Sequence, residues 1–183
     1  MPATKSRTEI TIQNIVVSTS LEHDIPLIKL AEVLPNTEYN PEQFPGLVMR
    51  IKDPKTSALI FSSGKIVLTG AKSLTKVKES LQKIIKNLAK IKIRIKIKPK
   101  INVQNMVASG SIHMDLNLNS LAMKLDNTEY EPEQFPGLVY KLAGTKATFL
   151  LFSNGKIVCT GTKSETKLRE AVKKLVVVLK KVK

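Results

Sequence analysis

Uncharged side chains that can donate hydrogen bonds recur at the same positions in the two halves of the chain. Asn14 and Asn105 are 91 residues apart, and so are Thr69 and Thr160. The floor of an A·T minor groove presents only acceptors, adenine N3 and thymine O2, so amide and hydroxyl donors among aliphatic contacts suit it. The set therefore indicates contact with A·T base edges. Its aliphatic members are Val16, Val67, Val107 and Val158.

Four phenylalanines form a second recurring set. Phe44 and Phe135 each precede a proline in a turn-rich segment, and Phe61 and Phe152 lie on predicted strands. Apolar side chains of this kind can enter between base steps and act as wedges. A strand phenylalanine more often belongs to a core, but no core is expected in the two loops.

The remaining reactive residue types show no arrangement for catalysis or metal binding. His23 and His113 are not repeated and lack metal-ligand spacing, and Cys159 is predicted to be a small core residue. There is no glycine-rich phosphate loop, no nucleophile elbow and no carboxylate pair on a shared face. We therefore expect no metal, no cofactor and no enzymatic activity.

Charge and composition point in the same direction. The 183 residues include 30 Lys+Arg and 15 Asp+Glu, a formal net charge of +15, so a polyanionic partner is expected, although a lysine-rich surface can also serve solubility. A hydrophobic content of 42% excludes a disordered basic tail. No apolar run approaches the roughly 18 residues that would cross a bilayer. The start of the chain lacks a secretory signal, and a single cysteine forms no internal disulfide, so an intracellular, reducing compartment is expected.

An ungapped internal repeat organises the whole chain. EYNPEQFPGLV begins at Glu38 and EYEPEQFPGLV at Glu129, again 91 residues apart. Solenoid units are usually 20 to 50 residues long, so this longer repeat indicates a duplicated half-domain. The predicted organisation is a short N-terminal segment, repeat 1, a basic junction and repeat 2, at residues 1–11, 12–92, 93–102 and 103–183.

Hydrophobic periodicity predicts β-α-β-β-β-α in each repeat, with an optional short strand at residues 38–40. The first helix is predicted to start at an Asp24 or Asp115 N-cap, and the second at Ser73 or Ser164. The strands of repeat 1 are predicted at residues 10–18, 47–52, 58–62 and 65–69. In the junction, isoleucines alternate with cations, which indicates an amphipathic connection with a solvated basic edge more than a nucleic-acid patch.

Both faces of the predicted antiparallel sheet are largely apolar. Ile66 and Leu68 point to one side, and Val67 and Thr69 to the other. A solvent face should instead be polar, so the second face is expected to be an interface. The alternative is a sandwich core between the two halves, in which Asn14 would be costly unless it were paired.

At these residues the sequence resembles the TATA-box-binding protein family. The combination QN-I-V, EY-P-E-x-FPG and L-x-F-x-SGK-x-V-x-TGAKS occurs twice from about Thr11 onward. In the second copy Asn154 replaces the serine of the SGK element and Thr162 the alanine of TGAKS. The resemblance implies an α+β fold, a saddle of two pseudo-symmetric repeats. Each repeat is a curved antiparallel sheet with two helices on its convex side. The family is itself a known example of minor-groove kinking, so DNA bending is implied by the resemblance alone.

The resemblance also implies roles for individual residues. Phe44 and Phe61 would unstack one end of the DNA element, and Phe135 and Phe152 the other. Asn14 and Asn105 would donate to the central base pairs. The groove would further be lined by Val16, Leu59, Val67, Thr69, Val107, Leu150, Val158 and Thr160, and the phosphates met by Arg50, Lys65, Lys72, Lys141, Lys156 and Lys163.

The partners implied are A·T-rich promoter DNA, transcription factor B docked at Glu131, Glu133 and Gln134, and RNA polymerase indirectly. The short segment before the repeat resembles archaeal members, which implies a cytoplasmic protein. Both loops read Phe-Pro-Gly, which removes one source of asymmetry on the DNA. Two rival readings are an accessory platform of a nucleic-acid enzyme and a pure protein-interaction module, and preference for A·T over G·C duplex separates DNA binding from both.

Overall fold

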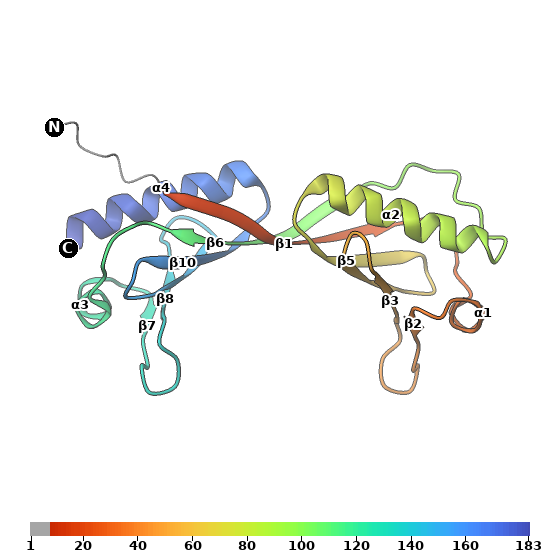
Figure 1. Ribbon diagram of the computed structural model, residues 1–183, viewed down its shortest axis with the longest axis horizontal. Coiled ribbons are helices and arrows are strands. Elements are labelled where there is room, and N and C mark those ends of the chain that lie inside the picture. The colour runs from red at the N-terminus through yellow and green to blue at the C-terminus, as the bar shows by residue number, and fades with distance from the viewer. Residues whose placement is uncertain (1–7) are drawn as a thin grey trace. The chain divides into compact units, whose positions relative to one another are not determined.

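The computed structural model describes residues 8–183, so the first seven residues of the predicted N-terminal segment lie outside the described part. This part contains four helices and ten strands (Figure 1). It divides into two compact units. The N-terminal unit comprises residues 14–104, and the C-terminal unit comprises residues 105–183 together with the start of the first strand, up to Gln13.

Each unit has the predicted order of elements, with the short extra strand present in both. In the first half of the chain these are β1 (Glu9–Ser20), α1 (Leu27–Val33), β2 (Thr37–Glu38), β3 (Leu47–Ile51), β4 (Thr56–Ile60), β5 (Lys65–Ala71) and α2 (Leu74–Ala89). In the second half they are β6 (Asn102–Ser111), α3 (Leu118–Lys124), β7 (Thr128–Glu129), β8 (Leu138–Lys141), β9 (Thr148–Leu151), β10 (Lys156–Thr162) and α4 (Glu165–Val182). The antiparallel strand orders are β2-β3-β4-β5-β1 and β6-β10-β9-β8-β7.

The predicted caps of the second helix in each unit are confirmed, but those of the first helix are wrong. Ser73 Oγ and Ser164 Oγ each accept a hydrogen bond from the backbone N–H three residues later. Asp24 and Asp115 cap nothing: α1 begins after Pro26, which makes no side-chain cap, and α3 after Asn117, which caps Ser120 N.

The displaced start of these first helices has a backbone cause. Ile25 N–H donates to Ser62 O, and Leu116 N–H to Ser153 O, both at 2.8 Å. The chain beyond each aspartate is thus still held against the β4–β5 or β9–β10 turn. Each helix therefore begins beyond the residue that makes this hydrogen bond.

Each unit buries a core between its sheet and its long helix. α2 packs on β5 and α4 on β10 (Figure 1). Ile66 and Leu68 of β5 are at most 2% exposed, and Ile157 and Cys159 of β10 at most 1%. The apolar spacing of the long helices predicts one buried stripe on each. Leu81, Ile84 and Leu88 of α2 are buried, as are Leu168, Val172, Leu175 and Leu179 of α4, whereas Ile85 and Val176 at the edge of the stripe are only half-buried.

The basic junction forms no strand before Asn102. Ile91 is buried at its start, Ile97 is exposed, and its cations are solvated. Thr19 Oγ1 of β1 donates to Lys100 O at 2.7 Å and holds the segment within the N-terminal unit. The predicted amphipathic alternation is therefore present only as a partial burial of isoleucines. No helix within residues 8–183 is long and apolar enough to span a bilayer.

Candidate nucleic-acid interface

The amide of Asn14 is held in one orientation by the backbone of β5. Its Oδ1 accepts the N–H of Gly70 at 2.7 Å, and its Nδ2 donates to Thr69 Oγ1 at 3.1 Å. Asn105 repeats the arrangement with Gly161 N at 2.8 Å and Thr160 Oγ1 at 2.9 Å. The amide oxygen is thereby occupied. In the hydrogen bonding of the described residues, one Nδ2 hydrogen of each asparagine is left for an external acceptor.

A β-bulge creates the backbone group that each asparagine binds. The register of β1 on β5 shifts between Ile15 and Val17, and that of β10 on β6 between Cys159 and Thr162. The bulged glycines adopt φ of 98° at Gly70 and 94° at Gly161, a region that favours glycine. A bulge leaves its extra residue out of the ladder, and the asparagine oxygen satisfies that residue's N–H. The sequence analysis noted Thr69 and Thr160, each of which precedes one of these glycines, but it did not predict the bulge.

The aliphatic residues of the predicted groove surface form the sheet face opposite the helices. Leu59 pairs with Val67 across β4 and β5, and Leu150 with Val158 across β9 and β10. These four side chains, with Val16 and Val107, are half-buried, whereas their strand neighbours on the helix side are buried. Because Asn14 is paired, the expected cost of burying it does not argue against a sandwich core. Each unit by itself presents an uncharged, half-exposed sheet face on the side away from its helices.

The four phenylalanines pair within each unit. Phe44 meets Phe61 edge to face, with ring centroids 5.9 Å apart and an interplanar angle of 67°. Phe135 meets Phe152 at the same 5.9 Å and 71°. The loop members are each 42% exposed. The loop phenylalanines thus hold a defined position on the strand phenylalanines while keeping exposed surface.

Two glycines that the sequence analysis did not single out seat these rings. A Cβ added at Gly46 would lie 2.7 Å from Phe44 Cε1 and 3.1 Å from Phe61 Cε1. At Gly137 the same distances, 2.7 Å and 3.1 Å, would separate it from Phe135 and Phe152. The 2.7 Å separations are shorter than the contacts that real Cβ atoms make, and the 3.1 Å separations are tight. The signal was available, because each loop phenylalanine is followed two residues later by glycine.

The predicted phosphate-binding cations all lie exposed at strand ends. Lys65 and Lys156 begin β5 and β10, and Lys72 and Lys163 follow those strands. Lys141 ends β8. Arg50 of β3 differs, because its Nη1 lies 3.2 Å from Glu38 Oε2 of β2. Its other guanidinium N–H groups make no hydrogen bond within the described residues.

The three residues predicted to dock transcription factor B lie in the β7–β8 loop, which projects from its sheet (Figure 1). Glu131 O accepts the N–H of Gln134 at 3.0 Å and that of Phe135 at 2.9 Å. This turn places Phe135 and leaves the side chains of Glu131, Glu133 and Gln134 exposed.

The other titratable candidates remain isolated. His23 Nδ1 lies 2.6 Å from Asp24 O, and His113 Nε2 lies 4.0 Å from Glu9 Oε2. Cys159 is fully buried, and burial raises its pKa to about 11, so the predicted core role is confirmed. Within residues 8–183 no three His, Cys, Asp or Glu side chains gather as metal ligands.

The fold and this surface define a duplicated α+β protein with a half-exposed, uncharged sheet face bordered by cations. A family model described as "Transcription factor TFIID (or TATA-binding protein, TBP)" matches residues 9–91 and again 100–182. The chain therefore belongs to the TATA-box-binding protein family. This is a family of DNA-binding transcription factors, so the expectation that the chain is no enzyme is confirmed by its membership.

Curated relatives and a solved structure agree with the family match. The chain is 51% identical to the TATA-box-binding protein of Thermococcus kodakarensis, over 96% of this chain and 93% of that one. It is 51% identical to that of Picrophilus torridus, over 95% and 96%. The structure of the Methanococcus jannaschii TBP superposes with a TM-score of 0.89 at 47% identity, covering 94% of this chain and 99% of that chain. This match confirms the predicted α+β, TBP-like fold.

Proposed function

We propose that this protein is a general transcription initiation factor that binds the TATA-box promoter element through the minor groove and bends it. It then recruits transcription factor B and, through it, RNA polymerase. The observation that carries the proposal is the duplicated asparagine, oriented by a bulge glycine and left with a free amide hydrogen. The relatives' shared name supports the promoter element as the ligand.

We assign the half-exposed sheet face to contact with the floor of the DNA minor groove. Adenine N3 and thymine O2 accept hydrogen bonds, which Asn14 and Asn105 donate at the centre. A guanine N2 amino group would add a donor and a steric obstacle there, so A·T pairs are preferred. The flanking contacts are Val16, Leu59, Val67, Thr69, Val107, Leu150, Val158 and Thr160.

The two phenylalanine pairs are assigned as wedges. An exposed ring that rests on a second ring and on a glycine loses little freedom when it inserts between base pairs. Partial unstacking at two steps kinks the duplex and opens its minor groove. Phe44 and Phe61 act at one end, and Phe135 and Phe152 at the other.

The strand-end cations are assigned to phosphates. They border the uncharged face, so each can reach a backbone oxygen while the face meets base edges. The residues are Arg50, Lys65, Lys72, Lys141, Lys156 and Lys163.

The β7–β8 loop is assigned to transcription factor B. The side chains of Glu131, Glu133 and Gln134 in this loop are exposed. DNA phosphates would repel its two carboxylates, so the loop is better suited to a protein partner. In the aligned loop of the N-terminal unit, Asn40 stands where the C-terminal unit has Glu131, so the extra carboxylate marks one end for a basic partner. A protein with these partners works at the chromosome, in the cytoplasm of a cell without a nucleus.

The proposal is tested by fluorescence anisotropy with A·T-rich and G·C-rich duplexes at two salt concentrations. Tighter binding to the A·T duplex at both concentrations is expected. Equal affinity for the two duplexes would favour the interaction-module reading, in which the apolar face meets a protein.

A further inference from the structure

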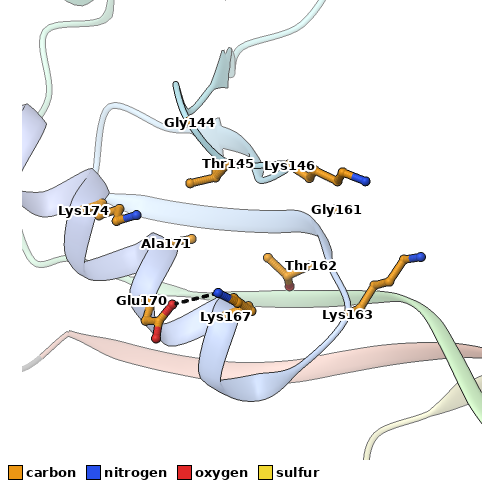
Figure 2. A pocket seen from close by; sticks show the side chains of 10 residues that line it. All are labelled: Gly144, Thr145, Lys146, Gly161, Thr162, Lys163, Lys167, Glu170, Ala171 and Lys174. Atoms are coloured by element: carbon orange, nitrogen blue, oxygen red, sulfur yellow. Dashed lines mark ion pairs between the residues drawn. The ribbon is translucent and has the colours of Figure 1, made fainter.

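A cavity of about 550 Å³ lies on the helix side of the C-terminal unit, between the loop before β9, the end of β10 and α4 (Figure 2). Lysines approach it from three elements: Lys146 from the loop, Lys163 after β10, and Lys167 and Lys174 on α4. Glu170 is the one carboxylate in the lining, and its Oε2 lies 3.7 Å from Lys167 Nζ. The rim therefore keeps an excess of positive charge.

The rest of the lining consists of small residues, of which Thr145 and Thr162 carry a polar side-chain atom. Gly144, Gly161 and Ala171 contribute no polar side-chain atom. Thr162 is 7% exposed, and its Oγ1 is the buried side-chain oxygen that has no hydrogen-bond partner among the described residues. The cavity thus combines a mainly apolar lining with a rim of cations.

The N-terminal unit also has a hollow at the corresponding place, next to Lys55, Thr56 and Gly70, but its buried hydroxyl groups there are paired with one another. Thr56 Oγ1 and Ser80 Oγ form a buried hydrogen bond at 2.8 Å. The residues 91 positions later are alanines, Ala147 and Ala171, so this bond cannot form in the C-terminal unit.

The lysine on the long helix shows the same contrast. Lys83 Nζ of α2 donates to Asp53 O. Its counterpart Lys174 makes no hydrogen bond or ion pair within the described residues, and glycine, Gly144, replaces the aspartate. The C-terminal unit thus has alanine and glycine in the floor of the cavity and a lysine without a partner among the described residues. In the N-terminal unit the corresponding polar groups form hydrogen bonds with one another.

The cavity lies on the helix side of β10 and meets the surface assigned to DNA only at Gly161 and Lys163. Thr160 lies on the half-exposed sheet face, whereas Thr162 lies on the side that faces α4. Lys163 alone belongs both to this lining and to the proposed phosphate contacts. A duplex backbone meets cations along a strand edge and has no apolar part to place in a hollow on the helix side.

We propose that this cavity binds an acidic peptide segment that carries an apolar side chain. The apolar side chain occupies the floor at Ala171 and Gly144, and the flanking carboxylates pair with Lys146, Lys167 and Lys174. Complementary charge supplies the orientation, and the buried apolar group supplies affinity that charge alone does not. The proposal does not depend on the protein's DNA element.

The test uses two fluorescein-labelled synthetic peptides, Asp-Glu-Asp-Leu-Glu-Asp and the same peptide with serine for leucine. Anisotropy titration of the full chain should show saturable binding of the leucine peptide and binding at least tenfold weaker for the serine peptide. Equal binding of the two would show charge attraction alone and overturn the proposal, as would no binding at millimolar protein.

A matched pair of double variants locates the site. Lys146→Glu with Lys174→Glu should weaken binding of the leucine peptide about tenfold, by reversing two rim charges. Lys55→Glu with Lys83→Glu makes the same change of net charge at the corresponding place in the N-terminal unit and should weaken it much less. Equal loss in both would contradict the site. If an A·T duplex displaces the peptide, and the first pair lowers DNA affinity more than the second, the cavity belongs to the DNA surface and the proposal is wrong.

Discussion

At the residue scale, we assign to each of the two asparagines a structural role and a recognition role, carried by different atoms. Oδ1 of Asn14 satisfies the N–H of Gly70, and Nδ2 carries the hydrogen that faces outward. A carboxylate can take over the first role but not the second. The two roles can therefore be separated by an almost isosteric substitution.

Asn14→Asp and Asn105→Asp should each retain the hydrogen bond to the bulge glycine and lose the donor to the base. Each variant should melt within a few degrees of the parent, while affinity for an A·T duplex falls about tenfold or more, the effect of losing a base-edge hydrogen bond and adding repulsion. Thermal melting and anisotropy measure the two effects. A folded variant with parental affinity would move these residues out of the groove.

The wedge assignment predicts a joint loss of affinity and bending. Phe44→Ala with Phe61→Ala should reduce the bend angle measured by fluorescence resonance energy transfer across a labelled A·T duplex, because fewer steps are unstacked. Phe135→Ala with Phe152→Ala should do the same at the other end. Parental bending by a folded double variant would exclude that pair as wedges.

At the element scale, loops and bulges fix the site, and here sequence and structure diverged most. Periodicity predicted the strands and long helices well, because their apolar residues face a core. The helix starts at Asp24 and Asp115 were wrong, because a backbone bond to a distant turn holds each chain extended. The bulges at Gly70 and Gly161 depend on strand register, which the residue types do not specify.

The seat beneath each loop phenylalanine gives a prediction at this scale. Gly46→Ala should displace the Phe44 ring, since the added Cβ would lie 2.7 Å from it, and so weaken DNA bending. In the Phe44→Ala background the same change should add little, because the ring it displaces is gone. An equal loss in both backgrounds would show that Gly46 acts independently of Phe44. Gly137→Ala provides the corresponding test in the C-terminal unit.

At the scale of the whole molecule, much of the positive charge lies away from the surface that we assign to DNA. Many of the lysines lie on α2, on α4 and in the junction, away from the sheet face. The internal repeat made the fold and the duplicated face predictable from the sequence. The unpaired groups of the cavity beside α4 were not predicted, because they depend on which residues pair in the folded N-terminal unit and are replaced by alanine and glycine in the C-terminal unit.

The six assigned phosphate contacts predict the salt dependence of binding. At about 0.9 per neutralised phosphate, the slope of log affinity against log salt should be about −5. Titrations between 50 mM and 300 mM potassium chloride would measure it. A slope near −13, expected if all 15 net charges were engaged, would show that the lysines of the helices and junction also contact DNA.

The most direct test of the central claim uses a duplex whose minor groove resembles that of A·T pairs and whose major groove resembles that of G·C pairs. A duplex in which inosine·cytosine pairs replace the A·T pairs lacks the guanine N2 amino group and so presents an A·T-like minor groove with a G·C-like major groove. Anisotropy titrations should show the inosine duplex bound nearly as tightly as the A·T duplex, and the G·C duplex bound far more weakly. If the inosine duplex binds as weakly as the G·C duplex, the sheet face does not read the minor groove.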